Sequence, residues 1–302
     1  MKSTLLATAA AVGLLALPQS AFAAPPDMGM VQVNLGYGWT DDNITNWSPF
    51  DDPVSYGART QWLFPLSEPV HLQADLFAER MNNVIDGGEF GSQDSTLYGG
   101  TVHVIHPMEH GRIGAAGSIY NVQSFGFEPF VGKGRESVDY GLVALEGQYF
   151  TSNWTLFGQG GWFNDISGCT GAEGCVHNAV FFRANATYFF TPNAALNVDG
   201  NIFFGDDEAI GTVNGGTARV EGEYKFTDSR FSAFVGLSYE EEEVDVFSAS
   251  ASENTTTVDV GIRMYLDQST LFAFSQEGPS MNTPTFHHAL ATEGVLQLDA
   301  DD

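Results

Sequence analysis

The chain has 302 residues, with 38 acidic against 11 basic side chains and a formal net charge of -27. So acidic a protein lacks the basic footprint that binds nucleic acid, and it is a poor binder of bare anionic lipid. Charged residues are only 16% of the chain and aromatic residues are 13%, which favours strands of alternating polarity over an ordinary soluble core.

The first residues have the three parts of a secretory signal peptide. Lys2 precedes an apolar run over residues 5–17, and Ala-Phe-Ala follows at residues 21–23. The apolar run is too short to cross a bilayer as a helix. We therefore predict a signal peptide over residues 1–23, cleaved after Ala23, with an uncleaved anchor as the alternative.

Twelve segments, most of them alternating in polarity, follow between residues 31 and 266. In residues 70–79 the apolar set is Val70, Leu72, Ala74, Leu76 and Ala78, and mostly polar side chains lie between them. No apolar run is long enough for a spanning helix, and only helices and closed barrels satisfy the backbone in lipid. We predict that residues 24–267 form an all-β, antiparallel, up-and-down transmembrane β-barrel of about 12 strands. A soluble β-sandwich or barrel is the alternative.

The connections between these segments alternate in length. Short connections occur at residues 65–69, 107–111, 151–153, 191–193 and 227–229. Long ones occur at residues 41–53, 81–94, 123–136, 165–174, 206–215 and 241–253. Short periplasmic turns and long extracellular loops are typical of outer-membrane barrels, and an even strand number puts both ends of the barrel on the periplasmic side.

Aromatic residues gather near both ends of the predicted strands. Trp154, Phe190 and Tyr265 lie near short turns, and Trp39 and Trp162 lie near long loops. Two belts of this kind are expected where a barrel meets the two membrane interfaces.

The last segment ends in Gly261, followed at three and five positions by the bulky apolar residues Met264 and Leu266. It resembles the C-terminal sorting signal of outer-membrane barrels, and most of the chain after residue 23 resembles a small porin-like barrel of Gram-negative bacteria. The resemblance implies residence in the outer membrane and recognition by the barrel-assembly machinery. Residues 269–274 are an alternative closing segment.

If the apolar set faces lipid, the other set faces the lumen. Nine charged residues then lie inside the barrel at or near mid-height, and these are the predicted pore-lining residues: Arg59, Asp75, Glu146, Arg183, Asp199, Arg219, Glu221, Asp259 and Arg263. Charge inside a membrane is costly unless it is paired or wet. One interpretation is a constriction that selects solutes, and the other is a set of ion pairs that fill and brace a closed lumen. We favour a narrow pore because many uncharged polar residues face inward as well.

Three further features of the sequence carry predictions of their own. Cys169 and Cys175 predict a local disulfide, because two cysteines lie close together in an exported chain. Residues 268–302 lose the alternation and predict a flexible acidic periplasmic tail, with a plug in the lumen as the alternative. The acidic loops are interpreted as solubilising, or as binding divalent cations near lipopolysaccharide.

The function predicted from these features is passive diffusion of small hydrophilic solutes through a polar lumen, with weak cation preference from the acidic loops. A structural or adhesive barrel with a closed, ion-paired lumen is the main alternative, with its function in the long loops. A lipid hydrolase is disfavoured because the strand histidines fall on lumen-facing positions and no Gly-x-Ser-x-Gly follows the signal peptide. We expect no enzyme activity, no cofactor and no metal. The expected partners are outer-membrane lipid, lipopolysaccharide and the barrel-assembly machinery.

Overall fold

The computed structural model of the protein describes residues 28–42, 52–67, 69–85, 93–124, 136–167, 176–207, 211–246, 249–267, 269–287 and 290. Twelve strands fill most of these ranges: β1 (Met28–Asp42), β2 (Val54–Ser67), β3 (Val70–Ile85), β4 (Gln93–Met108), β5 (Gly111–Ser124), β6 (Glu136–Phe150), β7 (Trp154–Asp165), β8 (Val176–Thr191), β9 (Ala194–Asp207), β10 (Gly211–Lys225), β11 (Phe231–Val246) and β12 (Ala249–Tyr265). The predicted signal peptide, Cys169 and Cys175 lie outside the described residues.

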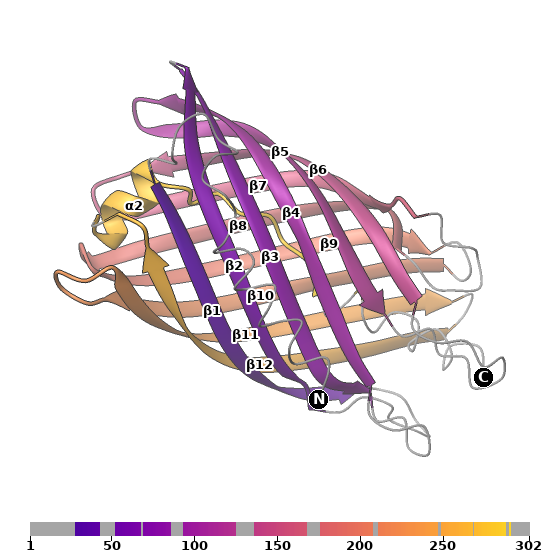
Figure 1. The fold of residues 1–302 in the computed structure, drawn as a ribbon. Coiled ribbons are helices and arrows are strands. Elements are labelled where there is room, and N and C mark those ends of the chain that lie inside the picture. The colour runs from indigo at the N-terminus through magenta and orange to yellow at the C-terminus, as the bar shows by residue number, and fades with distance from the viewer. Residues whose placement is uncertain are drawn as a thin grey trace.

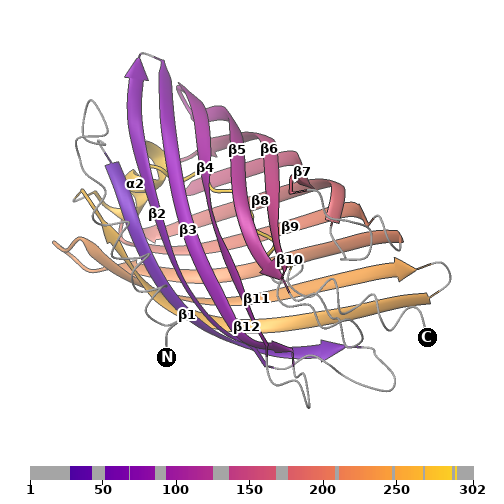
Figure 2. The same ribbon diagram turned by 45° about the vertical axis from the view of Figure 1, so that its right-hand side comes forward.

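The strands form one closed antiparallel barrel in which each strand pairs with its neighbours in sequence (Figures 1 and 2). Closure is between the first and last strands, where the pairing runs from Met30 opposite Tyr265 to Asp42 opposite Glu253. The predicted fold class and strand number are therefore confirmed. Closure leaves no open sheet edge, as a lipid environment requires.

Side chains alternate between the lumen and the outside along each strand. On β3 the inward residues Gln73, Asp75 and Phe77 are buried, whereas on β12 the outward residues Val260 and Ile262 are each 51% exposed. The exposed face is apolar because it contacts lipid rather than water. A closed barrel with such an exterior is the architecture of Gram-negative outer-membrane proteins, and the protein is located in that membrane.

The outer face also carries the two aromatic belts. Trp154 and Phe190 are exposed near the short turns, and Trp39 and Trp162 are exposed toward the long loops. The assignment of Tyr265 to a belt was wrong, because this side chain points into the lumen. Its hydroxyl donates to Glu223 Oε1 at 2.6 Å, and its ring packs edge-on against Phe274 at 4.6 Å between centroids.

The segment after β12 begins with a helix, α2 (Leu271–Glu277), and not with the alternative closing strand over residues 269–274. Thr270 caps the helix by accepting a hydrogen bond from the Ala273 amide. The helix lies at the short-turn end of the barrel (Figure 1), where the Phe272 amide donates to Pro192 O at 3.1 Å. Among the described residues, no helix has the length and apolar character needed to cross a bilayer.

After α2 the described residues run up the lumen, as in the alternative of a plug and not as in the predicted flexible periplasmic tail. The segment packs into three apolar clusters, which follow one another from the short turns toward the long loops. Leu271 and Phe274 pack near the short turns, Met281 packs with Leu63, Ile105 and Phe157, and Phe286 and Leu290 join the main apolar cluster toward the long loops. In that cluster the Phe286 ring lies 4.9 Å from the Phe163 ring and 5.1 Å from the Phe203 ring between centroids. We call the described residues 269–287 and 290 the lumen segment.

Polar side chains of the barrel wall satisfy the backbone of the lumen segment. Arg112 donates to Gly278 O and Ser275 O, both at 2.9 Å. Gln61 Nε2 donates to Met281 O at 3.2 Å, and Gln73 Nε2 donates to the same oxygen. Twelve strands enclose more space than their own side chains fill, so a segment can enter if its buried carbonyl groups find donors. The inward Gln61 and Gln73 supply two of those donors, which explains why the lumen segment can be buried at Met281.

Candidate functional site

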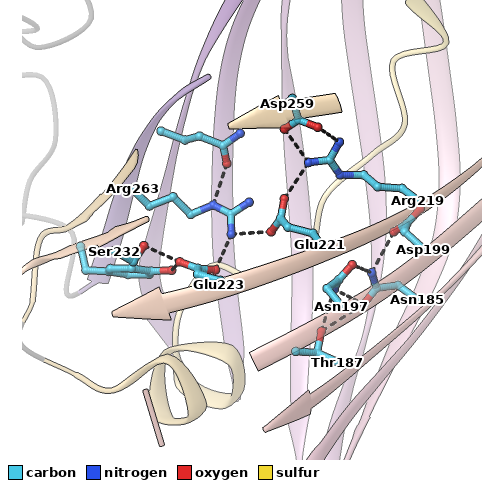
Figure 3. Close-up of polar contacts among 12 residues, drawn as sticks. Asn185, Thr187, Asn197, Asp199, Arg219, Glu221, Glu223, Ser232, Asp259 and Arg263 are labelled. Atoms are coloured by element: carbon cyan, nitrogen blue, oxygen red, sulfur yellow. Dashed lines mark hydrogen bonds and ion pairs between the residues drawn. The ribbon is translucent and has the colours of Figure 1, made fainter. Parts of the chain in front are cut away.

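The wall formed by β9 to β12 carries a network of ion pairs on its inner face (Figure 3). Arg219 of β10 reaches across β11 to Asp259 of β12 and binds both carboxylate oxygens, at 2.5 and 2.8 Å. The same guanidinium donates to Glu221 Oε2 at 2.8 Å. Its fork geometry matches a carboxylate, so the pair is held in one orientation.

Gly236 makes this cross-strand pair possible. In the register of the sheet it lies between Glu221 and Asp259, on the strand that Arg219 must cross. A Cβ atom at this position would lie 2.6 Å from Asp259 Oδ1 and 2.7 Å from Arg219 Cζ. The missing side chain therefore provides the space that the guanidinium occupies.

Arg263 of β12 extends the network toward the short turns. Its Nη1 lies 2.7 Å from Glu221 Oε1 and also pairs with Glu223, and its Nε donates to Gln32 Oε1 at 2.8 Å. Glu221 thus bridges two arginines, as Figure 3 shows. The side chain of Arg263 is 14% exposed, so its charge is compensated mainly by these partners and little by water.

Arg183 of β8 forms a second pair beside the first network. Its Nη2 and Nε donate to Asp199 Oδ2 at 2.6 and 3.0 Å, and Asn185 Nδ2 donates to the same oxygen at 2.9 Å. Arg183 Nη1 donates to Asn282 O of the lumen segment at 2.7 Å. The wall charge therefore also helps to fix the lumen segment.

Arg59 of β2 differs from these arginines. It forms no hydrogen bond or ion pair with any residue that the structure describes. Its guanidinium carbon lies 5.5 Å from the centroid of the Phe77 ring, a cation–π contact. Among the charged groups near it are Asp75, Arg183, Glu79 and Arg263.

A cavity of about 440 Å³ runs between this charged wall and the lumen segment. At the short-turn end it is lined by Tyr265 and Phe274, and toward the long loops by Pro53 and Glu240. The lumen segment and the main apolar cluster around Phe163, Phe203 and Phe286 fill the other side of the barrel. The remaining space is therefore off-centre, with charged and polar side chains on the strand side and a mixture of small polar and larger apolar residues of the lumen segment on the other side.

Asp75 and Glu146 lie apart from the cavity, in a cluster around His103. His103 Nδ1 lies 2.7 Å from Glu146 Oε1, and its Nε2 lies 3.6 Å from Asp75 Oδ2. Gln61 and Gln73 each donate to Asp75 at 2.8 Å. These groups are buried and bind mainly one another, although His103 Nε2 and Gln73 Oε1 have no hydrogen-bond partner among the described residues. Their arrangement fits bracing of the barrel wall next to the lumen segment.

A serine, a histidine and a carboxylate also meet in the lumen. Ser95 Oγ lies 3.0 Å from His287 Nε2, and His287 Nδ1 lies 3.8 Å from Glu79 Oε2. Ser95 is fully buried and its hydroxyl also contacts Gln123 O at 3.0 Å, so no substrate reaches it. The His287–Glu79 distance exceeds a hydrogen bond. This trio therefore lacks the geometry of an activated nucleophile.

Seven of the nine predicted pore-lining residues line the cavity, and the other two, Asp75 and Glu146, do not. The predicted sorting residues lie at the end of β12: Gly261 faces Asn34 across the closing seam, and the amide of Leu266 donates to Gly29 O at 2.9 Å. Within the described ranges, no group of three or more His, Cys, Asp or Glu is arranged to hold a metal ion.

Sequence reasoning missed several residues that complete the site. The alternation places Glu223 on the same inward face as Glu221, but Glu223 was not included among the predicted pore-lining residues. Asn282 and Phe286 carried no such signal, because the segment that holds them has no strand periodicity. Gln32 has inward parity, but its bond to Arg263 could not be predicted because it depends on the pairing of β1 with β12 at barrel closure.

Comparison with known proteins supports the fold alone. No family model matches the chain, and no curated protein sequence matches it. An outer membrane channel from Pseudomonas putida is similar in structure, with a TM-score of 0.57 and 11% identity over 83% of this chain and 99% of that one. A FadL homologue of Pseudomonas aeruginosa has a TM-score of 0.46 and 9% identity, over 82% of this chain and 94% of that one. The KdgM porin in complex with disordered oligogalacturonate has a TM-score of 0.42 and 9% identity, over 77% and 98%.

Proposed function

We propose that the protein is an outer-membrane channel through which small hydrophilic solutes diffuse passively. The observation that carries this proposal is the off-centre cavity, which has lining residues from both ends of the barrel and a charged polar wall along one side. The similarity to an outer membrane channel from Pseudomonas putida is consistent with such a role.

The size of the cavity limits the solutes that fit. A volume of about 440 Å³ lies at the small end of the range of about 300–1,000 Å³ for pockets that hold drug-sized molecules. The lumen segment limits this size, because it occupies part of the space that the strands enclose. We therefore expect a narrow pore for small solutes.

The charge of the wall supports weak selectivity. Arg183, Arg219 and Arg263 face Asp199, Glu221, Glu223 and Asp259 around the cavity, and every one of these charges has a partner. Paired charges can be kept inside a membrane protein at moderate cost and still offer hydrogen-bonding groups to a passing solute. Solutes and ions of both signs are expected to pass, with the balance set by the few groups that stay uncompensated.

One observation favours the alternative of a structural barrel with a closed lumen. The lumen segment is anchored by three apolar contacts and by hydrogen bonds from Arg112 and Arg183, which is how a permanent plug is held. The two proposals differ in whether ions cross the cavity beside this segment.

In either case we propose that the barrel contacts outer-membrane lipid and lipopolysaccharide through its outer face and acidic loops. We also propose that Gly261, Met264 and Leu266 act as the signal for the barrel-assembly machinery. Met264, at the short-turn end of β12, and Leu266, just after it, have outward parity, so their side chains are available to a second protein during assembly.

The test is single-channel recording in potassium chloride from the protein without residues 1–23, refolded in planar lipid bilayers. Wild-type protein is expected to give small discrete current steps. Replacing Arg219→Gln leaves Asp259 without its cation, so the reversal potential in a salt gradient should shift toward cation preference. Arg230→Gln is the matched control, because this arginine lies exposed in the turn between β10 and β11.

Two results would count against the proposal, the first against an open pore and the second against the role of the charged wall. The first is a silent bilayer although the barrel is shown to be folded and inserted, which would support the closed structural barrel. The second is current with the same reversal potential in wild type, Arg219→Gln and Arg230→Gln, which would separate conduction from this wall.

A further inference from the structure

Arg59 is the one strand cation, among the residues that the structure describes, that has no polar partner. Arg80, Arg112, Arg183, Arg219, Lys225 and Arg263 all donate to an oxygen. Arg59 nevertheless lines the cavity. An inward guanidinium without an acceptor is unusual, because its five donors then depend on water or on a ligand.

The carboxylates near Arg59 are bound elsewhere. Asp75 accepts hydrogen bonds from Gln61 and Gln73 at 2.8 Å each, and Glu79 lies beside His287. Neither lies within ion-pair distance of Arg59. Arg183 and Arg263 also interact with Arg59 from the cavity wall, so both acidic and basic groups act on it, with Asp75 the strongest of them.

Neutral amide groups surround the same part of the cavity. Gln32 is opposite Arg59 in the sheet, and its Oε1 accepts from Arg263, which leaves its amide donors for another group. Asn34 and Asn282 line the cavity as well. The Phe77 ring packs against the Arg59 guanidinium and restricts its orientation.

We infer that Arg59 is the binding site for the carboxylate group of a small organic anion that passes through this channel. A carboxylate accepts two parallel hydrogen bonds from a guanidinium, and the amides of Gln32 and Asn34 are donors for the oxygens of the rest of the solute. The inference rests on the proposed function, since it names the class of solute that the pore favours.

The acidic character of the chain does not oppose this site. Of the net charge of -27, the twelve strands carry 21 acidic and 7 basic residues, a net -14, and the rest of the chain carries -13. On the cavity wall, however, Asp199, Glu221, Glu223 and Asp259 are each paired with an arginine, whereas Arg59 has no ion-pair partner among the described residues. At physiological ionic strength the field of exposed charges decays over about 8 Å. A solute anion inside the lumen therefore responds to Arg59 and its neighbours more than to distant loops.

Binding can be measured separately from conduction. We would titrate carbon-13-labelled acetate against the refolded barrel in detergent micelles and follow the broadening of its nuclear magnetic resonance line. Wild type should bind acetate, and Arg59→Gln should bind it at least about tenfold more weakly, because charge-assisted hydrogen bonds are lost. Arg59→Lys keeps the charge without the fork and should give an intermediate affinity. Arg230→Gln should bind as the wild type does.

The same four proteins are then recorded in bilayers with a gradient of potassium acetate. Arg59→Gln is expected to lower the permeability to acetate relative to potassium, and Arg230→Gln is expected to leave it unchanged. If acetate binding is the same in wild type and Arg59→Gln, the site is overturned even when the channel conducts. If binding depends on Arg59 but no variant conducts, the site stands and the proposed function fails.

Discussion

Replacing Phe286 by alanine should release the lumen segment from its uppermost anchor. Phe286 is buried and its ring contacts Phe163, Phe181 and Phe203 at 4.9, 5.6 and 5.1 Å between centroids. Buried Phe→Ala changes cost about 3–5 kcal/mol, and each aromatic pair contributes about 0.5–1.5 kcal/mol. The barrel strands stay paired without this ring, so the cost should fall on the docking of the segment.

A loss of about 3 kcal/mol raises the undocked population by about 150-fold. The assay places a single cysteine at Thr283, which is buried at 4% exposure, in a protein without the two native cysteines. It then measures the rate of labelling by a maleimide too large for the cavity. When docking is fast, this rate follows the undocked population. Phe226→Ala, in an exposed position near a short turn, is the control. A rise below about tenfold, or an equal rise in the control, would refute the reasoning.

Three further predictions concern the wall and the lumen segment. Arg219→Gln should lower the free energy of unfolding by about 3–5 kcal/mol, measured in urea, since it leaves Asp259 buried without its cation; stability equal to the wild type would contradict the role of the pair. Gly236→Ala changes no charge but should displace the Arg219 guanidinium and so alter the single-channel current. An unchanged current would show that Arg219 does not need the space left by the missing side chain. Cysteines at Thr101 and Thr283, whose hydroxyl oxygens are 3.2 Å apart, should form a disulfide on mild oxidation, seen as a mobility shift on gels; the absence of cross-linking in folded protein would place the segment elsewhere.

The barrel could be predicted from the sequence because its pattern is local. In β3, Gln73 and Asp75 alternate with Leu72 and Ala74. Because successive side chains of a strand point to opposite faces of the sheet, this alternation assigns the first pair to the lumen and the second pair to lipid. The same rule put Arg183 and Arg219 inside. The pairing of Arg219 with Asp259 across a third strand could not be predicted, because it depends on the space left by one glycine.

The position of the lumen segment could not be predicted because it has no periodicity of its own. Its anchors, among them Met281 and Phe286, contact strands far away in the sequence. The inward glutamines were interpreted as lining a wet pore, whereas Gln61 and Gln73 donate to the backbone of this segment. A polar residue that faces the lumen therefore indicates that a hydrogen-bond partner is present there. The sequence alone does not say whether that partner is water or another part of the protein.

The central claim is that solutes pass through a narrow space between the charged wall and the lumen segment. The most direct measurement compares single-channel currents of the wild type with those of a chain that ends at Asp267, both refolded and shown to be closed barrels. The claim predicts small steps from the wild type and steps several-fold larger from the shortened chain, because the segment no longer fills the barrel. Equal steps from the two chains, or a silent wild type beside a conducting shortened chain, would contradict it.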